Sequence, residues 1–175
     1  MAETPEQYIQ RILGNVEGKE PLRVQRSTAR KLAGLIKGLD KRRLLERPAP
    51  GKWSIVEILA HLADAELVIG WRMRSILENS GTALQAYDQD VWADTFNYRR
   101  RDPKVSLETF RVLRESNLTL LKVVRKNLWE NYGMHQERGK ETITHVVRLN
   151  AGHDLNHLRQ VESIVKSARK PKKAK

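Results

Sequence analysis

Two histidines stand four residues apart near the end of the chain, in the stretch HDLNHLRQ over residues 153–160. A helix turns about 100° per residue, so side chains at positions i and i+4 lie one above the other. His153 and His157 could therefore direct both imidazoles at one ion. Neighbouring apolar positions place both rings at the edge of the apolar face, where an unpaired imidazole is costly to bury. The spacing alone is a weak motif, and two boundary histidines bonded to backbone or water are the alternative.

A third histidine, His61, occupies the same kind of boundary in an earlier helical segment. If the two segments face each other in a bundle, its imidazole completes a set of three nitrogens, which can bind a divalent metal and leave a coordination position open. A lone histidine at such a boundary is more often a satisfied structural residue. Asp64, one turn later, either orients an imidazole or forms a surface ion pair, and the sequence favours neither use.

The two remaining histidines are not expected to bind the ion. His135 falls in the stretch YGMHQERG, which predicts a solvated loop residue. His145 precedes His153 by eight residues, which places it about 80° around the helix and more than two turns away. We therefore restrict the candidate site to the other three.

Helical periodicity dominates the chain, and no stretch shows the sustained alternation of a strand. After a short N-terminal helix, apolar positions predict four long amphipathic helices, over residues 22–39, 55–79, 106–131 and from 143 onwards. Capping signals mark the helix starts, and the expected N-caps are Thr4, Ser54, Ser106 and Thr142. Ser54 also forms a capping box with Glu57. These features predict an all-α protein, most economically packed as a four-helix bundle.

A long connection over residues 80–105 joins the second and third long helices, and its length allows these two to run parallel. The stretch DQDVWADTF predicts a short helix within it. Trp92 lies in this stretch, and we expect it to serve packing or, as the alternative, to line the mouth of a pocket.

Composition limits the class of protein. The 175 residues suit one domain, expected over residues 1–165. Without cysteine, a metal site must use histidine, carboxylates and water. Half of the net charge of +12 lies in residues 166–175, which we expect to form a disordered basic tail. The N-terminal stretch does not look like a signal peptide and no apolar run could span a membrane, so we expect a cytoplasmic protein.

Three stretches together resemble the DinB/YfiT-like superfamily of metalloenzymes: GKWSIVEILAHLADAE (51–66), YDQDVWA (87–93) and MHQERGKETITHVVRLNAGHDLNHLRQ (134–160). The resemblance implies an up-down-down-up bundle, often a homodimer, in which three histidines hold a divalent transition metal such as zinc, nickel or iron. Residue by residue, the ligands carry over to His61, His153 and His157.

The same resemblance implies a metal-dependent enzyme that acts on a small molecule, as a hydrolase or as a transferase that uses a low-molecular-weight thiol. It does not fix the substrate, because fold does not settle function. The alternative is a non-catalytic binding module whose basic tail and RRRDPK segment contact nucleic acid or a protein partner. No aromatic residues interleave with those charges, so we do not expect nucleic-acid binding. A bundle whose histidines are purely structural is the third hypothesis.

Overall fold

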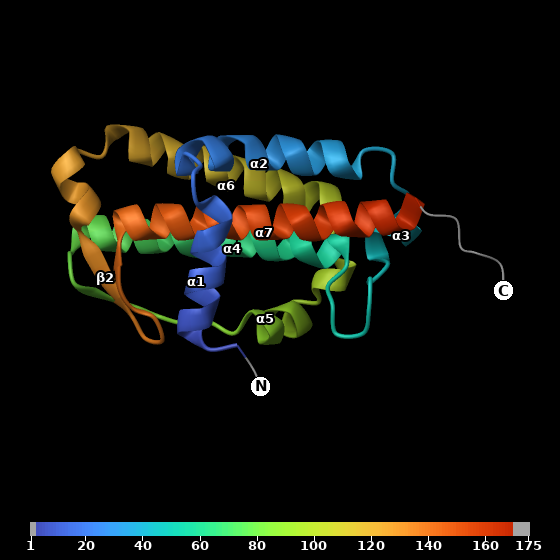
Figure 1. The fold of residues 1–175 in the computed structure, drawn as a ribbon, viewed down its shortest axis with the longest axis horizontal. Coiled ribbons are helices and arrows are strands. Elements are labelled where there is room, and N and C mark those ends of the chain that lie inside the picture. The colour runs from blue at the N-terminus through green and yellow to red at the C-terminus, as the bar shows by residue number, and fades with distance from the viewer. Residues whose placement is uncertain (1–2, 170–175) are drawn as a thin grey trace.

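Four long helices pack side by side in a computed structural model, which describes residues 3–169 (Figure 1). They are α2 (Pro21–Ile36), α4 (Ile55–Glu78), α6 (Pro103–Val123) and α7 (Ile143–Arg169). Both α2 and α4 pack against α6 and α7. Along the long axis, α2 and α7 run in one direction and α4 and α6 in the other, as Figure 1 shows. The up-down-down-up four-helix bundle implied by the resemblance is confirmed.

Three of the four N-cap residues expected from the sequence lie at the start of a helix. Thr4 and Ser54 each form a capping box, and the Thr142 hydroxyl accepts a hydrogen bond from the His145 N–H at the start of α7. Ser106 was the wrong choice for the third long helix. Asp102 caps α6 and Pro103 occupies its first position, so Ser106 lies one turn inside the helix and is buried.

Shorter helices surround the bundle. The first, α1 (Pro5–Val16), crosses α7, and α3 (Lys41–Leu45) precedes α4 (Figure 1). The long connection between α4 and α6 contains α5 (Gln89–Thr95), as the sequence predicted, and the 3-10 helix η1 (Tyr98–Arg100). A second 3-10 helix, η2 (Lys126–Glu130), follows α6, which therefore ends earlier than its apolar pattern predicted.

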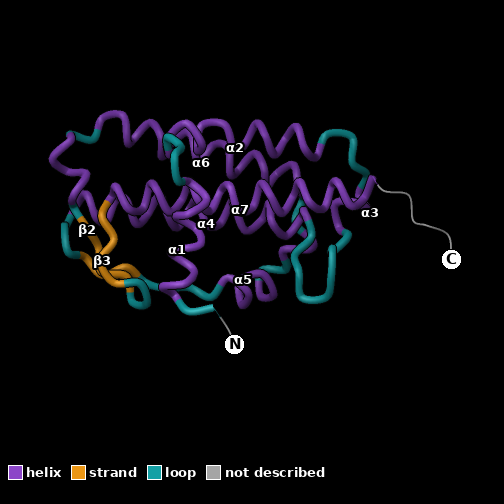
Figure 2. Tube along the Cα trace, in the orientation of Figure 1, coloured by secondary structure: helices purple, strands orange, loops and turns teal. Residues whose placement is uncertain are grey.

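Three short strands form a small sheet at one end of the bundle, which the sequence analysis did not predict (Figure 2). The strand β1 (Thr82–Leu84) pairs in parallel with β2 (Tyr132–His135), and β2 pairs antiparallel with β3 (Gly139–Thr142). Strands of three or four residues are too short to show an alternating pattern of their own. The pairing of β1 with β2 fixes the long connection to the hairpin before α7.

The interior contains two large apolar clusters with a polar layer between them, and a third, small cluster of Val16, Val24 and Ala151 lies where α1 and α2 meet α7. One cluster gathers the first turns of α4 and the last turns of α7, around Leu59 and Val161. The other lies toward the sheet, around Ile76 and Ile143. Between the two, buried polar side chains project from all four bundle helices, namely Gln25, Thr28, His61, Glu66, Arg114, Asn117, Asn150, Asp154 and His157. This layer holds the candidate site.

The last helix extends beyond the expected end of the domain, and the domain boundary itself stays a prediction. The structure continues α7 to Arg169, past the boundary placed at residue 165. Residues 170–175 of the predicted basic tail lie outside the described residues. Within the described part of the chain, no helix combines the length and the apolar character needed to cross a membrane.

Candidate metal centre

Three imidazoles from two helices meet in the polar layer. His61 Nε2 on α4 and His157 Nε2 on α7 each lie 3.0 Å from His153 Nε2. One ligand nitrogen from each ring lies within 4.8 Å of the others. A tetrahedral zinc ion with bonds of about 2.0–2.1 Å holds its nitrogen ligands about 3.3 Å apart, close to this spacing. The structure therefore brings together the three histidines singled out in the sequence.

Burial keeps these rings in the neutral form that binds metal. His61 and His157 are buried, and His153 is partly buried. Desolvation lowers the pKa of His61 and of His153 well below the usual value, and the neighbouring imidazoles lower it further. Burial also lowers the pKa of His157 to about 4. At neutral pH the cluster therefore presents lone pairs and not three positive charges.

The hydrogen-bond pattern indicates that a cation fits between the rings. His157 Nδ1 donates to Gln160 Oε1 over 2.8 Å, which leaves the Nε2 lone pair directed at the other two rings. His61 Nδ1 is buried without a hydrogen-bond partner among the described residues. Two nitrogens in contact can share only one proton, so three converging nitrogens are poorly satisfied by one another. A single divalent cation would accept all three lone pairs.

Asp64 takes the surface-pair role and not the orienting role. Its carboxylate accepts hydrogen bonds from the Tyr98 hydroxyl and the Arg101 guanidinium, each over 2.8 Å. These contacts fix η1 against α4. Burial and the Asp64 carboxylate raise the pKa of Tyr98, so its hydroxyl stays protonated. Gln160, the last residue of the HDLNHLRQ stretch, is instead the residue whose side chain contacts an imidazole of the cluster.

His135 was wrongly predicted as a solvated loop residue. It ends β2, is only 3% exposed, and its Nε2 atom is buried without a partner among the described residues. Burial lowers its pKa to about 4, and Arg138 and Arg72 contribute. His145, which we excluded from the metal set, lies in the first turn of α7 and is not part of the cluster.

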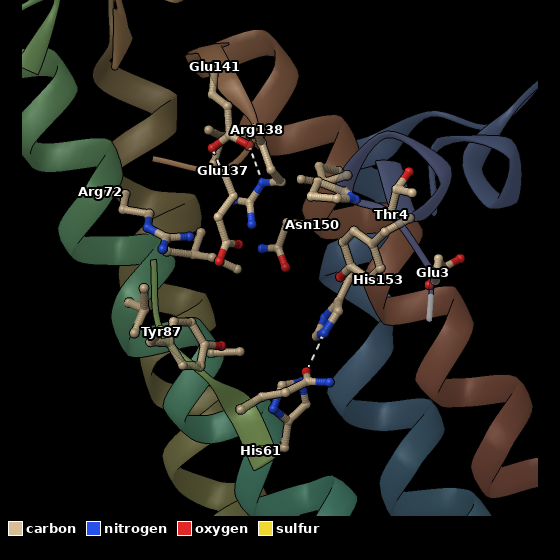
Figure 3. Close-up of a pocket in the computed structure, with 18 residues that line it drawn as sticks. Glu3, Thr4, His61, Arg72, Tyr87, Glu137, Arg138, Glu141, Asn150 and His153 are labelled. Atoms are coloured by element: carbon tan, nitrogen blue, oxygen red, sulfur yellow. Dashed lines mark hydrogen bonds and ion pairs between the residues drawn. The ribbon is translucent and has the colours of Figure 1, made fainter. Parts of the chain in front are cut away.

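A cavity of about 420 Å³ opens onto the histidines, as Figure 3 shows. His61 and His153 lie at one end of it, Tyr87 lies on the opposite wall, and Arg72 lies farther along (Figure 3). Apolar side chains of α4 and α7 form much of its wall: Ala65, Val68, Ile69, Val146 and Leu149. Burial raises the pKa of Tyr87 to about 12, so its hydroxyl remains a hydrogen-bond donor. Trp92 packs on Tyr87 with ring centroids 4.4 Å apart and supports this wall from behind.

A second cavity, of about 530 Å³, reaches the same centre from another side. His153 and His157 line it, together with Trp53, whose ring lies 4.9 Å from that of His61. Tyr8 of α1 lines both cavities. The helix α1 can approach this closely because residue 152 is glycine: a Cβ atom there would lie 2.1 Å from the Ile12 carbonyl oxygen. The position of α1 over the histidines therefore depends on Gly152.

A buried ion network supports the site from the centre of the bundle. Arg114 of α6 pairs with Glu66 of α4 at 2.8 Å and with Asp154 of α7 at 2.5 Å. Thr28 of α2 donates to Asp154, and Asn150 of α7 donates to Glu66. The network connects all four bundle helices. One of its members, Asp154, directly follows His153 in the chain. The network fixes the rotation of α7 on which the convergence of His153 and His157 with His61 depends.

Comparison with known proteins places this arrangement in a family. The sequence profile of the DinB superfamily matches residues 26–161. Two proteins of Oceanobacillus iheyensis are similar to the chain: "Putative metal-dependent hydrolase OB0782" is 24% identical over 116 residues, 66% of this chain and 67% of its own length. "Putative metal-dependent hydrolase OB0413" is 23% identical over 137 residues, 75% of this chain and 76% of its own length.

A solved structure shares the fold. It is described as "YfiT from Bacillus subtilis is a probable metal-dependent hydrolase with an unusual four-helix bundle topology". It superposes with a TM-score of 0.80 at 18% identity and covers 95% of this chain and 90% of that one. The profile match extends over most of the chain, from α2 to α7, and includes all three clustered histidines. The chain belongs to the DinB superfamily.

Proposed function

We propose that this protein is a metal-dependent hydrolase that acts on a small molecule, with His61, His153 and His157 as the metal ligands. The observation that carries the proposal is the convergence of the Nε2 atoms of these three buried or partly buried histidines, two of which, His61 and His153, line a cavity of about 420 Å³. The names of the similar Oceanobacillus iheyensis proteins support hydrolysis as the reaction class.

The chain supplies the rest of the site. His61, His153 and His157 would hold a divalent ion such as zinc, nickel or iron, which would supply Lewis-acid chemistry to the site when bound. Gln160 fixes the tautomer and the orientation of His157. The apolar wall would contact the apolar part of a substrate, and the Tyr87 hydroxyl and the Asn150 amide would offer hydrogen bonds along the cavity.

Metal content tests the ligand set directly. Protein purified without chelator should hold close to one transition-metal ion per chain by elemental analysis. The variant His157→Ala should lose it while circular dichroism shows an intact helical fold. His145→Ala is the matched control, because His145 lies on the same helix outside the cluster, and it should retain the metal. Wild-type occupancy in His157→Ala would refute the assigned ligands.

The reaction class is tested next. The metal-loaded protein should hydrolyse members of a panel of small esters and amides, and EDTA should abolish that activity. The alternative activity for the same centre is that of a transferase that uses a low-molecular-weight thiol. Activity only when a thiol and an electrophilic acceptor are both present would favour the transferase over the hydrolase.

Two further properties implied by the resemblance are kept as proposals. We propose a homodimer, which sedimentation velocity can test. Leu67 and Trp71 lie one turn apart on α4 and are 58% and 71% exposed, so the sedimentation of Trp71→Glu should be compared with that of the wild type.

We also propose a cytoplasmic location, which cell fractionation can test.

A further inference from the structure

Arg72 has no counter-ion of its own in the histidine cavity. It is only 7% exposed, yet no carboxylate of the described residues lies within 4.0 Å of its guanidinium. Its hydrogen bond goes to the Gln85 carbonyl oxygen over 2.5 Å, and the Tyr87 ring lies 5.9 Å away. A guanidinium has five N–H donors, so most of them remain available. A buried charge without a partner is costly, and such a group is a candidate for binding an anion.

The position of Arg72 connects it with the metal centre. Eleven residues separate Arg72 from His61 on α4, which corresponds to three helical turns, about 16 Å of rise and a difference in direction of about 20°. Both side chains therefore leave the same face of the helix. The side chains of Arg72 and His61 line the same cavity, and the Arg72 guanidinium lies against the Gln85 carbonyl oxygen. Ala65, Val68 and Ile69 line the cavity between them.

The other charges of the cavity do not neutralise Arg72. Glu141 is bound by Arg138 through two contacts of 2.7 and 3.2 Å, so that pair is internally balanced. Glu137 also lines the cavity, but it is exposed to solvent, and its carboxylate forms no ion pair with Arg72 within 4.0 Å. Glu3 is also exposed and is paired with Arg11. Among the described residues that line the cavity, Arg72 is therefore the buried cation that forms no direct ion pair.

We infer that the substrate of this site carries a carboxylate that pairs with Arg72, separated by a short apolar segment from the group that reacts at the histidines. This inference rests on the proposed function and narrows it to one substrate class. A single guanidinium suits a singly charged carboxylate, which it can bind through two parallel hydrogen bonds. The small apolar side chains between the two ends suit a chain of a few methylene groups.

Binding of simple acids tests the inference without a known substrate. Isothermal titration would compare succinate, glutarate and adipate with the matched monocarboxylates butyrate, pentanoate and hexanoate. One carboxylate of each diacid would occupy the metal end and the other would reach Arg72. In the zinc-loaded wild type, at least one diacid should bind about ten-fold or more tightly than its matched monoacid. Arg72→Gln should remove this preference, and Arg99→Gln, an equal loss of charge at an exposed residue, should keep it.

Each alternative outcome has a distinct meaning. A wild-type protein without preference for any diacid overturns the inference, and so does a preference that survives Arg72→Gln. If Arg72→Gln does not fold, Arg72→Lys replaces it: the charge remains but the two-pronged geometry is lost, so the preference should shrink. The same titrations in EDTA separate the two proposals. If diacids bind through Arg72 equally well with and without zinc, the metal centre fails while the carboxylate site stands.

Discussion

His61 Nε2 and His153 Nε2 lie 3.0 Å apart although 92 residues separate them in the chain. Their approach depends on the pairing of α4 with α7, the second and the last helix of the bundle. Metal bound between them would connect these helices, so the ion should stabilise the folded protein as well as serve the reaction.

Metal removal is therefore expected to lower thermal stability. With zinc at one hundred times its dissociation constant, binding to the folded state contributes about 2.7 kcal/mol. Differential scanning calorimetry should show a higher melting temperature with zinc than with EDTA. The variant His153→Ala should melt at the same temperature in both conditions. A zinc-dependent shift that persists in this variant would place the bound ion elsewhere.

Gln160 is expected to act through His157 and not on the ion itself. Loss of the hydrogen bond in Gln160→Ala frees the ring to rotate, which should weaken metal binding about 10- to 100-fold. Competition with a chromogenic chelator measures this change. Gln160→Glu restores an acceptor for Nδ1–H and should recover much of the affinity. Equal affinity in all three proteins would show that the contact does not orient the ligand.

Arg114 should be the most sensitive position of the buried ion network. Replacement with methionine leaves Glu66 and Asp154 buried without their cation, at an expected cost of about 3–5 kcal/mol in the free energy of unfolding. Arg111→Met is the control on the same helix. Arg111 forms exposed pairs with Glu108 and Glu115, which are worth about 0–1 kcal/mol. Urea denaturation of both variants measures the contrast.

Gly152→Ala is expected to displace α1. The added methyl group would lie 2.1 Å from the Ile12 carbonyl oxygen, so either the helix moves or the protein loses about 1–3 kcal/mol. Gly14→Ala lies within α1 with nothing within 4 Å of the new atom, and it should be neutral or stabilising by about 0.5–1 kcal/mol. Limited proteolysis near α1 should accelerate only in the first variant. Similar behaviour of the two would mean that α1 is not held by this close crossing.

Acidification should destabilise the metal-free protein well above the pH at which carboxylates titrate. Burial lowers the pKa of His135 and of His157 to about 4, whereas the unfolded chain has ordinary histidines near 6.5. Between these values the unfolded state binds protons that the folded state does not. Stability is therefore greatest above pH 6.5 and falls with decreasing pH, by about 1.4 kcal/mol per unit for each such histidine.

Urea denaturation in EDTA from pH 7 to pH 4.5 measures this slope. The variant His135→Gln should make the dependence of the unfolding free energy on pH shallower, because one histidine fewer takes up a proton on unfolding. Glu57 does not obscure the result. Burial alone would raise its pKa, but hydrogen bonds from Arg47 and Ser54 outweigh burial and lower the pKa to about 2. Its contribution is lost only as the pH falls from about 4.5 toward 2. Stability independent of pH over the measured range would contradict the buried, neutral state of the two histidines.

The sequence by itself determined the helices and their faces. Local patterns are enough for this, because a cap such as Ser54 with Glu57 and a period of 3.6 residues act within a few turns. The same reasoning placed His61, His153 and His157 at the edges of apolar faces, and the resemblance supplied the pairing of their helices. The short sheet and the burial of His135 were missed, since strands of three or four residues form only when distant segments meet.

Only the tertiary structure decided which polar groups share the cavity. Arg72 falls on the same face of α4 as His61, and a helical projection could have placed both on one face. Its lack of an ion pair, however, depends on where α7 and the hairpin β2–β3 place their carboxylates. Asp64 shows the converse: the sequence left an orienting role and an ion pair equally open, and in the structure its oxygens accept hydrogen bonds from Tyr98 and Arg101 of the connection. Long-range packing selects among contacts that local sequence leaves equally available.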